Sequence, residues 1–169
     1  MWRAAVAIVG LAACSPDVPS APSPSTPEVE QPQAEQWPAN FEWLTGAGGD
    51  GRAWLYFGPD ESDNIYVHFE CRPNDGELNA EAFDFQGEGT RLVLSSERVR
   101  NEFEATPHRN EDIYSGVKAE ARVPLSAPVL QEFRRTGILA AGDPATIFRP
   151  ATSEELGRIE SFFVRCAGD

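Results

Sequence analysis

The sequence predicts an α+β fold that is mostly β: one antiparallel sheet system, either a sandwich or a partly open barrel, with two short helices. Three observations predict it. Apolar and polar residues alternate along several short segments, and turn residues separate these segments, which is typical of half-buried antiparallel strands. Two later segments instead repeat their apolar residues at helical spacing and carry helix-end signals, which predicts helices.

Two strands are predicted most clearly. In Ile65–Cys71 and in Val117–Val123 every second residue is apolar and the residues between are amphipathic or charged, so one face of each strand should be buried. Turn residues at 58–60 and 74–76 separate neighbouring strands. Weaker alternation predicts further strands at 53–57, 78–85, 91–95, 98–105 and 145–148.

The two helices are predicted from their ends. Ser126 stands before Pro128 as a candidate N-cap with an early proline, and Gly137 is a candidate stop. In the second helix, Thr152 and Glu155 fit a capping box. The apolar residues of this last helix share one face, and they are Leu156, Ile159, Phe162, Phe163 and Cys166.

The N-terminus has the pattern of an export signal. One positive charge, Arg3, precedes the apolar run Ala4–Ala13. As a helix this run would be only ~15 Å long, about half of the hydrocarbon core of a bilayer, so it is too short to be a transmembrane helix. A short cationic head, a short apolar segment and small residues at its end predict a signal peptide over 1–13.

The tetrapeptide Leu11-Ala12-Ala13-Cys14 closes this segment and resembles the lipobox of bacterial lipoproteins. The resemblance implies that the Cys14 thiol carries a diacylglyceryl group and that the signal is cut just before Cys14. Further acylation of the new amino terminus would give two or three acyl chains, which anchor firmly where one chain binds only marginally. In this family, Asp directly after the cysteine favours retention in the inner membrane. This sequence has Ser15 at that position, so the resemblance implies that the protein is sorted to the outer membrane. The alternative is an ordinary secretory signal in which Cys14 has no role.

A disordered linker is predicted over 14–40, after the lipidated Cys14. Seven of the fourteen prolines and few sizeable apolar residues lie in it, so it cannot bury enough surface to fold and favours extended polyproline II. The remaining residues, 41–169, are enough for a single β-rich domain, which we expect in the periplasm.

Two cysteines remain besides Cys14. Cys71 lies on the inner side of its predicted strand, and Cys166 lies on the buried face of the last helix. In an exported protein the simplest arrangement pairs them as a disulfide, which would link the last helix to the sheet. The alternative is two buried free thiols. A catalytic or metal-binding pair is disfavoured because neither cysteine has a CxxC partner.

No sequence pattern typical of an enzyme or a cofactor site is present. GxSxG, HExxH, P-loop and dinucleotide glycine motifs are absent. His68 on a strand and His108 in the loop-like segment 106–110 are interpreted as surface histidines, and Gly46–Gly51 as a flexible loop. The acidic loop 60–64 could ligate calcium, but its spacing is not that of an EF-hand, which favours a solvated turn. We therefore expect no enzyme activity, no cofactor and no metal.

The charge indicates which partners are favoured. A formal net charge of −13 at pH 7 repels nucleic acid and anionic lipid head groups and attracts a cationic protein, although it also serves solubility.

Two resemblances concern the domain. Phe69-Glu70-Cys71, 123–130 and 162–166 follow an order that resembles a domain of uncharacterised alphaproteobacterial envelope proteins, which implies paired cysteines and no activity. Phe69-Glu70-Cys71 with Gly76 is also similar to the small β-barrel lysozyme inhibitors, although no Lys-Gly motif follows Ser115-Gly116. The sequence thus predicts a membrane-anchored envelope lipoprotein that is a non-enzymatic binding or structural module; the alternative is an inhibitor of a cationic secreted hydrolase such as lysozyme.

Overall fold

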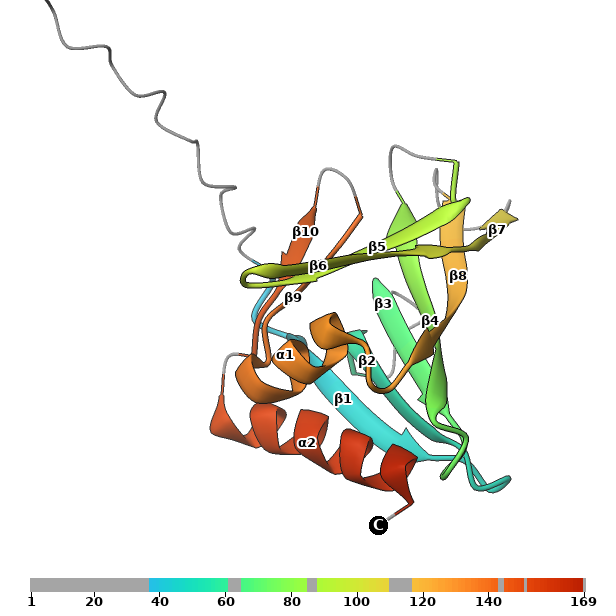
Figure 1. Ribbon diagram of the computed structural model, residues 1–169. Coiled ribbons are helices and arrows are strands. Elements are labelled where there is room, and N and C mark those ends of the chain that lie inside the picture. Colours follow the sequence, from blue (N-terminus) through green and yellow to red (C-terminus); the bar gives the residue numbers. More distant parts are fainter. Residues whose placement is uncertain are drawn as a thin grey trace, which may run out of the picture. The chain divides into compact units, whose positions relative to one another are not determined.

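A computed structural model describes residues 37–60, 65–84, 88–109, 117–142, 145–150 and 152–168 (Figure 1). The lipobox with Cys14, the linker before Trp37 and residues 61–64 of the acidic loop lie outside the described residues. The elements are β1 (Phe41–Ala47), β2 (Ala53–Pro59), β3 (Val67–Cys71), β4 (Glu77–Asp84), β5 (Arg91–Ser96), β6 (Val99–Glu104), β7 (Thr106–Arg109), β8 (Val117–Pro124), α1 (Pro128–Thr136), β9 (Leu139–Ala141), β10 (Thr146–Phe148) and α2 (Ser153–Ala167).

The strands form two antiparallel sheets, and the chain runs directly from an edge strand of the smaller sheet, β6, into an edge strand of the larger sheet, β7. The larger sheet has the order β1-β2-β3-β4-β8-β7 and the smaller one the order β10-β9-β5-β6. β6 pairs with β5, and directly after Ala105 the chain continues as β7, which pairs with β8. The chain therefore passes from one sheet to the other at Ala105, and the β5-β6 hairpin crosses over β4 and β8 (Figure 1). The predicted α+β, mostly β class is confirmed.

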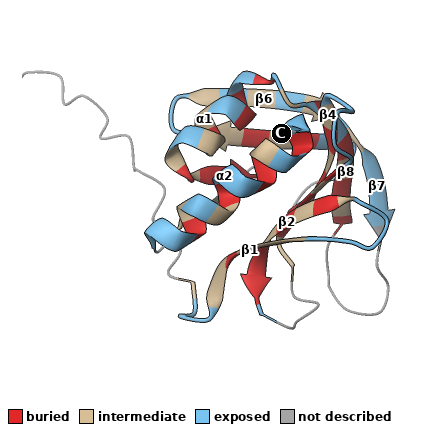
Figure 2. Cartoon of the chain, turned by 90° about the horizontal axis from the view of Figure 1, so that it is seen from below, coloured by how far each residue is buried: buried red, intermediate tan, exposed pale blue. Residues whose placement is uncertain are grey.

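One face of the larger sheet is buried against the helices and the smaller sheet. The alternation predicted for β3 and β8 is confirmed, since Val67, Phe69 and Cys71 are buried, as is every second residue of β8 from Val117 to Val123. Both helices lie on the same side of β1 and β2 (Figure 2). The large side chains that are completely buried include Trp43, Phe57, Phe69, Phe133, Phe148 and Phe162.

Helix α1 ends as predicted but begins differently. Gly137 adopts the left-handed conformation, with φ of 72°, and its N–H bonds to the Phe133 carbonyl. The prediction of Ser126 as the N-cap is wrong: Ser126 is still in the turn after β8, and Ala127 occupies the cap position without a side-chain bond. The cap comes from another strand, because the Val129 N–H donates to Oδ1 of Asn101 in β6 at 3.1 Å.

Helix α2 begins with the predicted capping box. The Glu155 N–H donates to the Thr152 hydroxyl at 3.2 Å, and the Thr152 N–H donates to Glu155 Oε2 at 2.9 Å. Glu155 Oε1 also accepts the N–H of Trp43 in β1 at 3.0 Å. Although it is a carboxylate, Glu155 is 2% exposed, and the three backbone and hydroxyl donors around it compensate for its burial.

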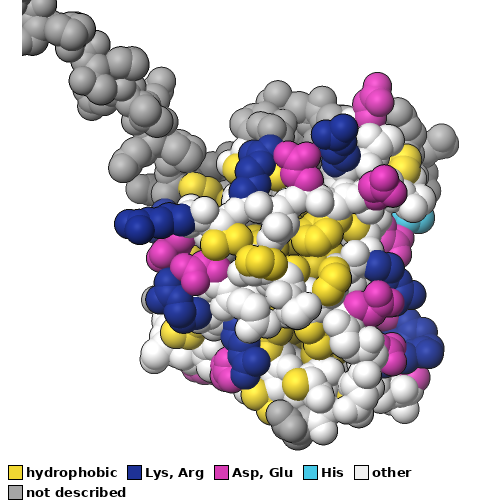
Figure 3. All heavy atoms as spheres, in the orientation of Figure 1, with side chains coloured by type: hydrophobic (Ala, Val, Ile, Leu, Met, Phe, Trp, Pro, Cys, Tyr) yellow, Lys and Arg dark blue, Asp and Glu magenta, His cyan; other side chains and the backbone are white. Residues whose placement is uncertain are grey.

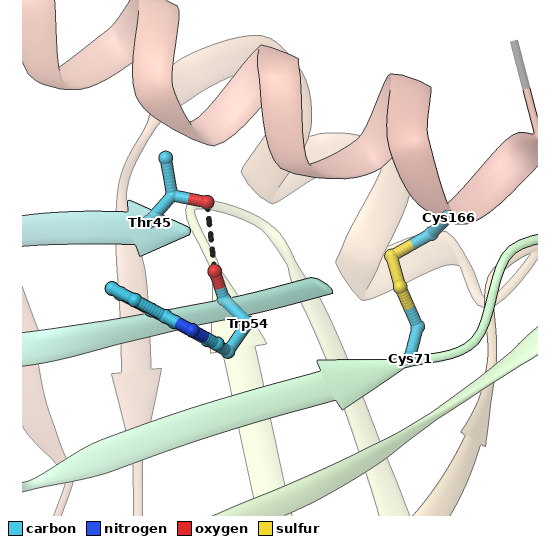
Figure 4. Close-up of a disulfide and its surroundings, with 4 residues drawn as sticks. All are labelled: Thr45, Trp54, Cys71 and Cys166. Carbon is cyan, nitrogen blue, oxygen red and sulfur yellow. Dashed lines mark hydrogen bonds between the residues drawn. A yellow bond between two sulfur atoms is a disulfide. The ribbon is translucent and has the colours of Figure 1, made fainter. Parts of the chain in front are cut away.

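The predicted disulfide is present. It joins Cys71 at the end of β3 to Cys166 in the last turn of α2, with Cα atoms 5.7 Å apart (Figure 4). A backbone bond lies beside it, since the Asn74 N–H donates to the Cys166 carbonyl at 3.1 Å. The last helix is thus fastened to the sheet as expected.

Several parts of the chain differ from the sequence interpretation. The loop-like segment 106–110 includes strand β7, and Gly46 belongs to β1 rather than to a loop; β1 and β9 were not predicted. Trp37, which was placed in the linker, stacks on Phe41 and Phe148 at ring distances of 5.3 and 5.6 Å, and its Nε1–H donates to the Ile147 carbonyl. The boundary at residue 41 otherwise stays a prediction.

Candidate functional site

The second face of the larger sheet is the candidate site. Among the described elements, the helices and the smaller sheet all pack on the opposite face, so this outer face carries the alternate, partly exposed side chains of each strand. Its composition is mixed aromatic and polar. The outward side chains include Leu44, Trp54, Tyr56, His68, Glu70, Asn79, Glu81, Lys118, Glu120 and Arg122.

Trp54 and Tyr56 form an aromatic pair on this face. They are two residues apart on β2, so they point the same way, and their rings stack at 5.3 Å with an interplanar angle of 26°. Gly46 lies opposite Trp54 on β1, and a Cβ at Gly46 would overlap the six-membered ring of the indole. The indole therefore lies over the glycine, which is the only residue type that leaves room for it there.

Carboxylates and guanidiniums border the aromatic pair. Arg52 pairs with Asp50 at 2.9 Å and with Glu70 at 2.5 Å, and Glu42 pairs with Arg158 of α2 at 2.5 Å. Burial, followed by the negative charges of Asp60 and Glu42, raises the pKa of Tyr56 above its ordinary value. The phenol is therefore held in its neutral form within a negative field.

A polar groove lies at the far edge of the larger sheet, where β7 and β8 meet β6 of the smaller sheet. Its hollow of about 720 Å³ lies beside the first residues of β7, where β8 continues past its pairing with β7. A smaller hollow of about 300 Å³ adjoins it, and both are lined by Asn79, Glu120 and Arg122. The larger hollow is also lined by Thr106 and His108. Apart from Ala121 and Phe103, its described lining is polar or charged, so the groove favours hydrogen-bonding or charged ligand groups over apolar ones.

Neither histidine is isolated. His108 Nε2 contacts Glu120 Oε2 at 2.5 Å, and Glu120 Oε1 accepts from Asn79 at 2.8 Å, so the amide orients the carboxylate and the carboxylate orients the imidazole. His68 is half-buried on the outer face opposite Tyr56 and Glu81. Burial is the main cause that lowers the pKa of His68, and Lys118 lowers it further against the opposing effects of Glu81 and Glu70. His68 therefore stays neutral near pH 7.

The structure separates the residues that the sequence singled out. Cys71 and Cys166 pair in the disulfide, on the buried face. Among the described residues, no three His, Cys, Asp or Glu side chains form a group that could hold a metal ion, and of the acidic loop only Asp60 is described. No described helix has both the length and the apolar character needed to cross a bilayer.

The aromatic pair was missed from the sequence. Its segment, Ala53–Phe57, is apolar at every position, so alternation does not indicate which side chains face outward. The helix side of the molecule also carries paired charges. There, basic and acidic side chains are interspersed (Figure 3), and several pair directly, such as Arg134 with Glu160 and Arg135 with Glu132.

Comparison with protein-family models, curated protein sequences and solved structures finds no match to this chain.

Proposed function

We propose that this chain is a membrane-anchored envelope lipoprotein whose domain is a non-enzymatic binding module. The observation that carries the proposal is the outer face of the larger sheet, which carries the stacked Trp54 and Tyr56 on β2 and is bordered by the polar groove at its far edge. Aromatic residues beside a polar rim are the composition that protein-binding surfaces favour.

Two features support the location. The lipobox ending at Cys14, with Ser15 after it, supports a lipid anchor in the outer membrane, with the domain facing the periplasm. The disulfide between Cys71 and Cys166 supports export, because structural disulfides form and persist in oxidising compartments.

The charge supports a second candidate, an inhibitor of a cationic secreted hydrolase such as lysozyme. A formal charge of −13 would steer such an enzyme to the domain. The detergent-extracted protein should then abolish lysozyme activity at a one-to-one ratio. Undiminished activity at micromolar protein would eliminate this candidate and leave the binding module unaffected.

Site-specific photocrosslinking in the native envelope tests the main proposal. A photoreactive amino acid at Tyr56 on the outer face should capture a distinct partner, identified by mass spectrometry. The same amino acid at Ser161, exposed on α2, is the matched control on the opposite side. Adducts from Ser161 but not from Tyr56, or from neither position, would contradict the proposal.

A further inference from the structure

No cation among the described residues lies on the stacked rings of Trp54 and Tyr56. Among the described residues, the cation–π contacts join Lys118 to Phe83 at 5.3 Å and Arg134 to Phe163 at 5.9 Å, and neither involves the outer aromatic pair. The nearest arginine along the chain, Arg52, is held by two carboxylates instead. No described cation of the chain therefore competes with an external cation for this aromatic pair.

The charges around the pair favour such a cation. The two guanidiniums that border the pair are each shared by two carboxylates, Arg52 by Asp50 and Glu70, and Arg158 by Glu42 and Glu154. These ion pairs therefore carry an excess of negative charge. The imidazole opposite Tyr56, that of His68, adds no positive charge near pH 7 because its pKa is lowered. Asp60 and Glu42 also lie close enough to Tyr56 for their negative charges to raise its pKa.

We propose that Trp54 and Tyr56 are the docking site for an arginine or lysine side chain of a cationic envelope protein. The inference rests on the proposed binding function and names its partner class. A guanidinium can stack on an indole or phenol while its N–H groups reach bordering carboxylates, which combines cation–π attraction with charge-assisted hydrogen bonds. An anionic partner would meet the same excess of carboxylates and be repelled.

A substitution at Gly46 can displace the Trp54 indole without removing it. A methyl group at Gly46 would overlap the Trp54 indole, so Gly46→Ala should displace the indole from its stacked position while every side chain of the proposed site is kept. The backbone of Gly46 lies in β1 outside the positive-φ region, so alanine fits its conformation.

Binding of heptaarginine to the detergent-extracted full-length protein tests the inference. Trp54→Leu and Tyr56→Leu keep the apolar bulk but lose the π face, and each should weaken binding about three- to tenfold. Gly46→Ala should weaken binding in the same direction, and added salt should weaken it for the wild type. Trp54→Phe keeps an aromatic face and should retain most of the affinity. Ser161→Ala, at an exposed position of α2 outside the candidate site, is the matched control and should bind like the wild type. Circular dichroism of each variant checks that the fold is kept.

Two further peptides test the role of charge. Heptacitrulline has nearly the shape of heptaarginine without its charge and should bind at least tenfold more weakly; heptaglutamate should not bind. Equal affinity of all variants for heptaarginine, or equal affinity of the wild type for heptacitrulline, would overturn the inference. If a partner is captured at Tyr56 in the envelope but heptaarginine does not bind, this inference is overturned and the proposed binding function stands. If no adduct forms at Tyr56, the proposed binding function itself is overturned.

Discussion

Glu155 is a single residue that joins the last helix to the first strand. One of its oxygens accepts the Trp43 N–H, and the other accepts the Thr152 N–H. Glu155→Gln replaces one of these oxygens with an NH2 group, so a buried donor faces another donor whichever way the amide turns. We expect a loss of about 1–3 kcal/mol in the free energy of unfolding, measured in urea.

The neighbouring Glu154 is the matched control for this variant. Its side chain is 76% exposed and pairs with Arg158 one turn later at 2.8 Å, so Glu154→Gln should cost less than about 0.5 kcal/mol. Equal losses for the two substitutions would show that the buried bonds of Glu155 contribute nothing beyond an exposed ion pair.

His68 makes the stability of the domain depend on pH. Its folded pKa is lowered below the ordinary 6.5, mainly by burial, so the unfolded state takes up the proton first as the pH falls. The contribution of His68 is therefore fully present above pH 6.5 and is lost as the pH falls toward the folded pKa. Between about pH 7 and pH 5 the wild type should lose more unfolding free energy than His68→Gln. Urea titrations with the same pH dependence for both proteins would contradict this.

At the scale of elements, the disulfide is the strongest link between α2 and the sheet. Cys71 and Cys166 are 95 residues apart in sequence, and closing a loop of that length stabilises by roughly 4–5 kcal/mol in the chain-entropy model. The double variant Cys71→Ala with Cys166→Ala should lose about that much in urea unfolding. Reductant should then have no effect on the variant while it destabilises the wild type; a wild type that is equally stable with and without reductant would contradict the prediction.

The strands and helices differ in how clearly the sequence predicts them. β3 and β8 alternate cleanly because one face is buried, and α2 carries its capping box within four residues. β9 is only three residues long and completely buried, and β7 contains Pro107, which an edge strand tolerates but which resembles a loop signal. The cap of α1 comes from Asn101, 28 residues away, and local sequence contains no sign of such a partner.

The features of the candidate site also differ in whether a local sequence signal marks them or only the tertiary fold does. The disulfide was predictable because each cysteine lies on the apolar side of an amphipathic element. The outer aromatic pair was not, since β2 is the second strand of a six-stranded sheet and its apolar residues occur on both faces. Which of them face outward depends on where the helices pack, and that is a property of the tertiary fold.

At the scale of the whole molecule, the proposed anchor decides where the binding face acts. If Cys14 carries two or three acyl chains, each buried CH₂ adds ~0.8 kcal/mol and the protein stays on the membrane. Labelled palmitate should therefore enter the wild type, and Cys14→Ser should lose both the label and the membrane fraction. Ser15→Asp is the control for sorting: it should keep the label and shift the protein from the outer to the inner membrane fraction. An unlabelled wild type with Cys14 intact, or a mature N-terminus at another residue, would remove the anchor, and the outer face would then have to act on a freely diffusing protein.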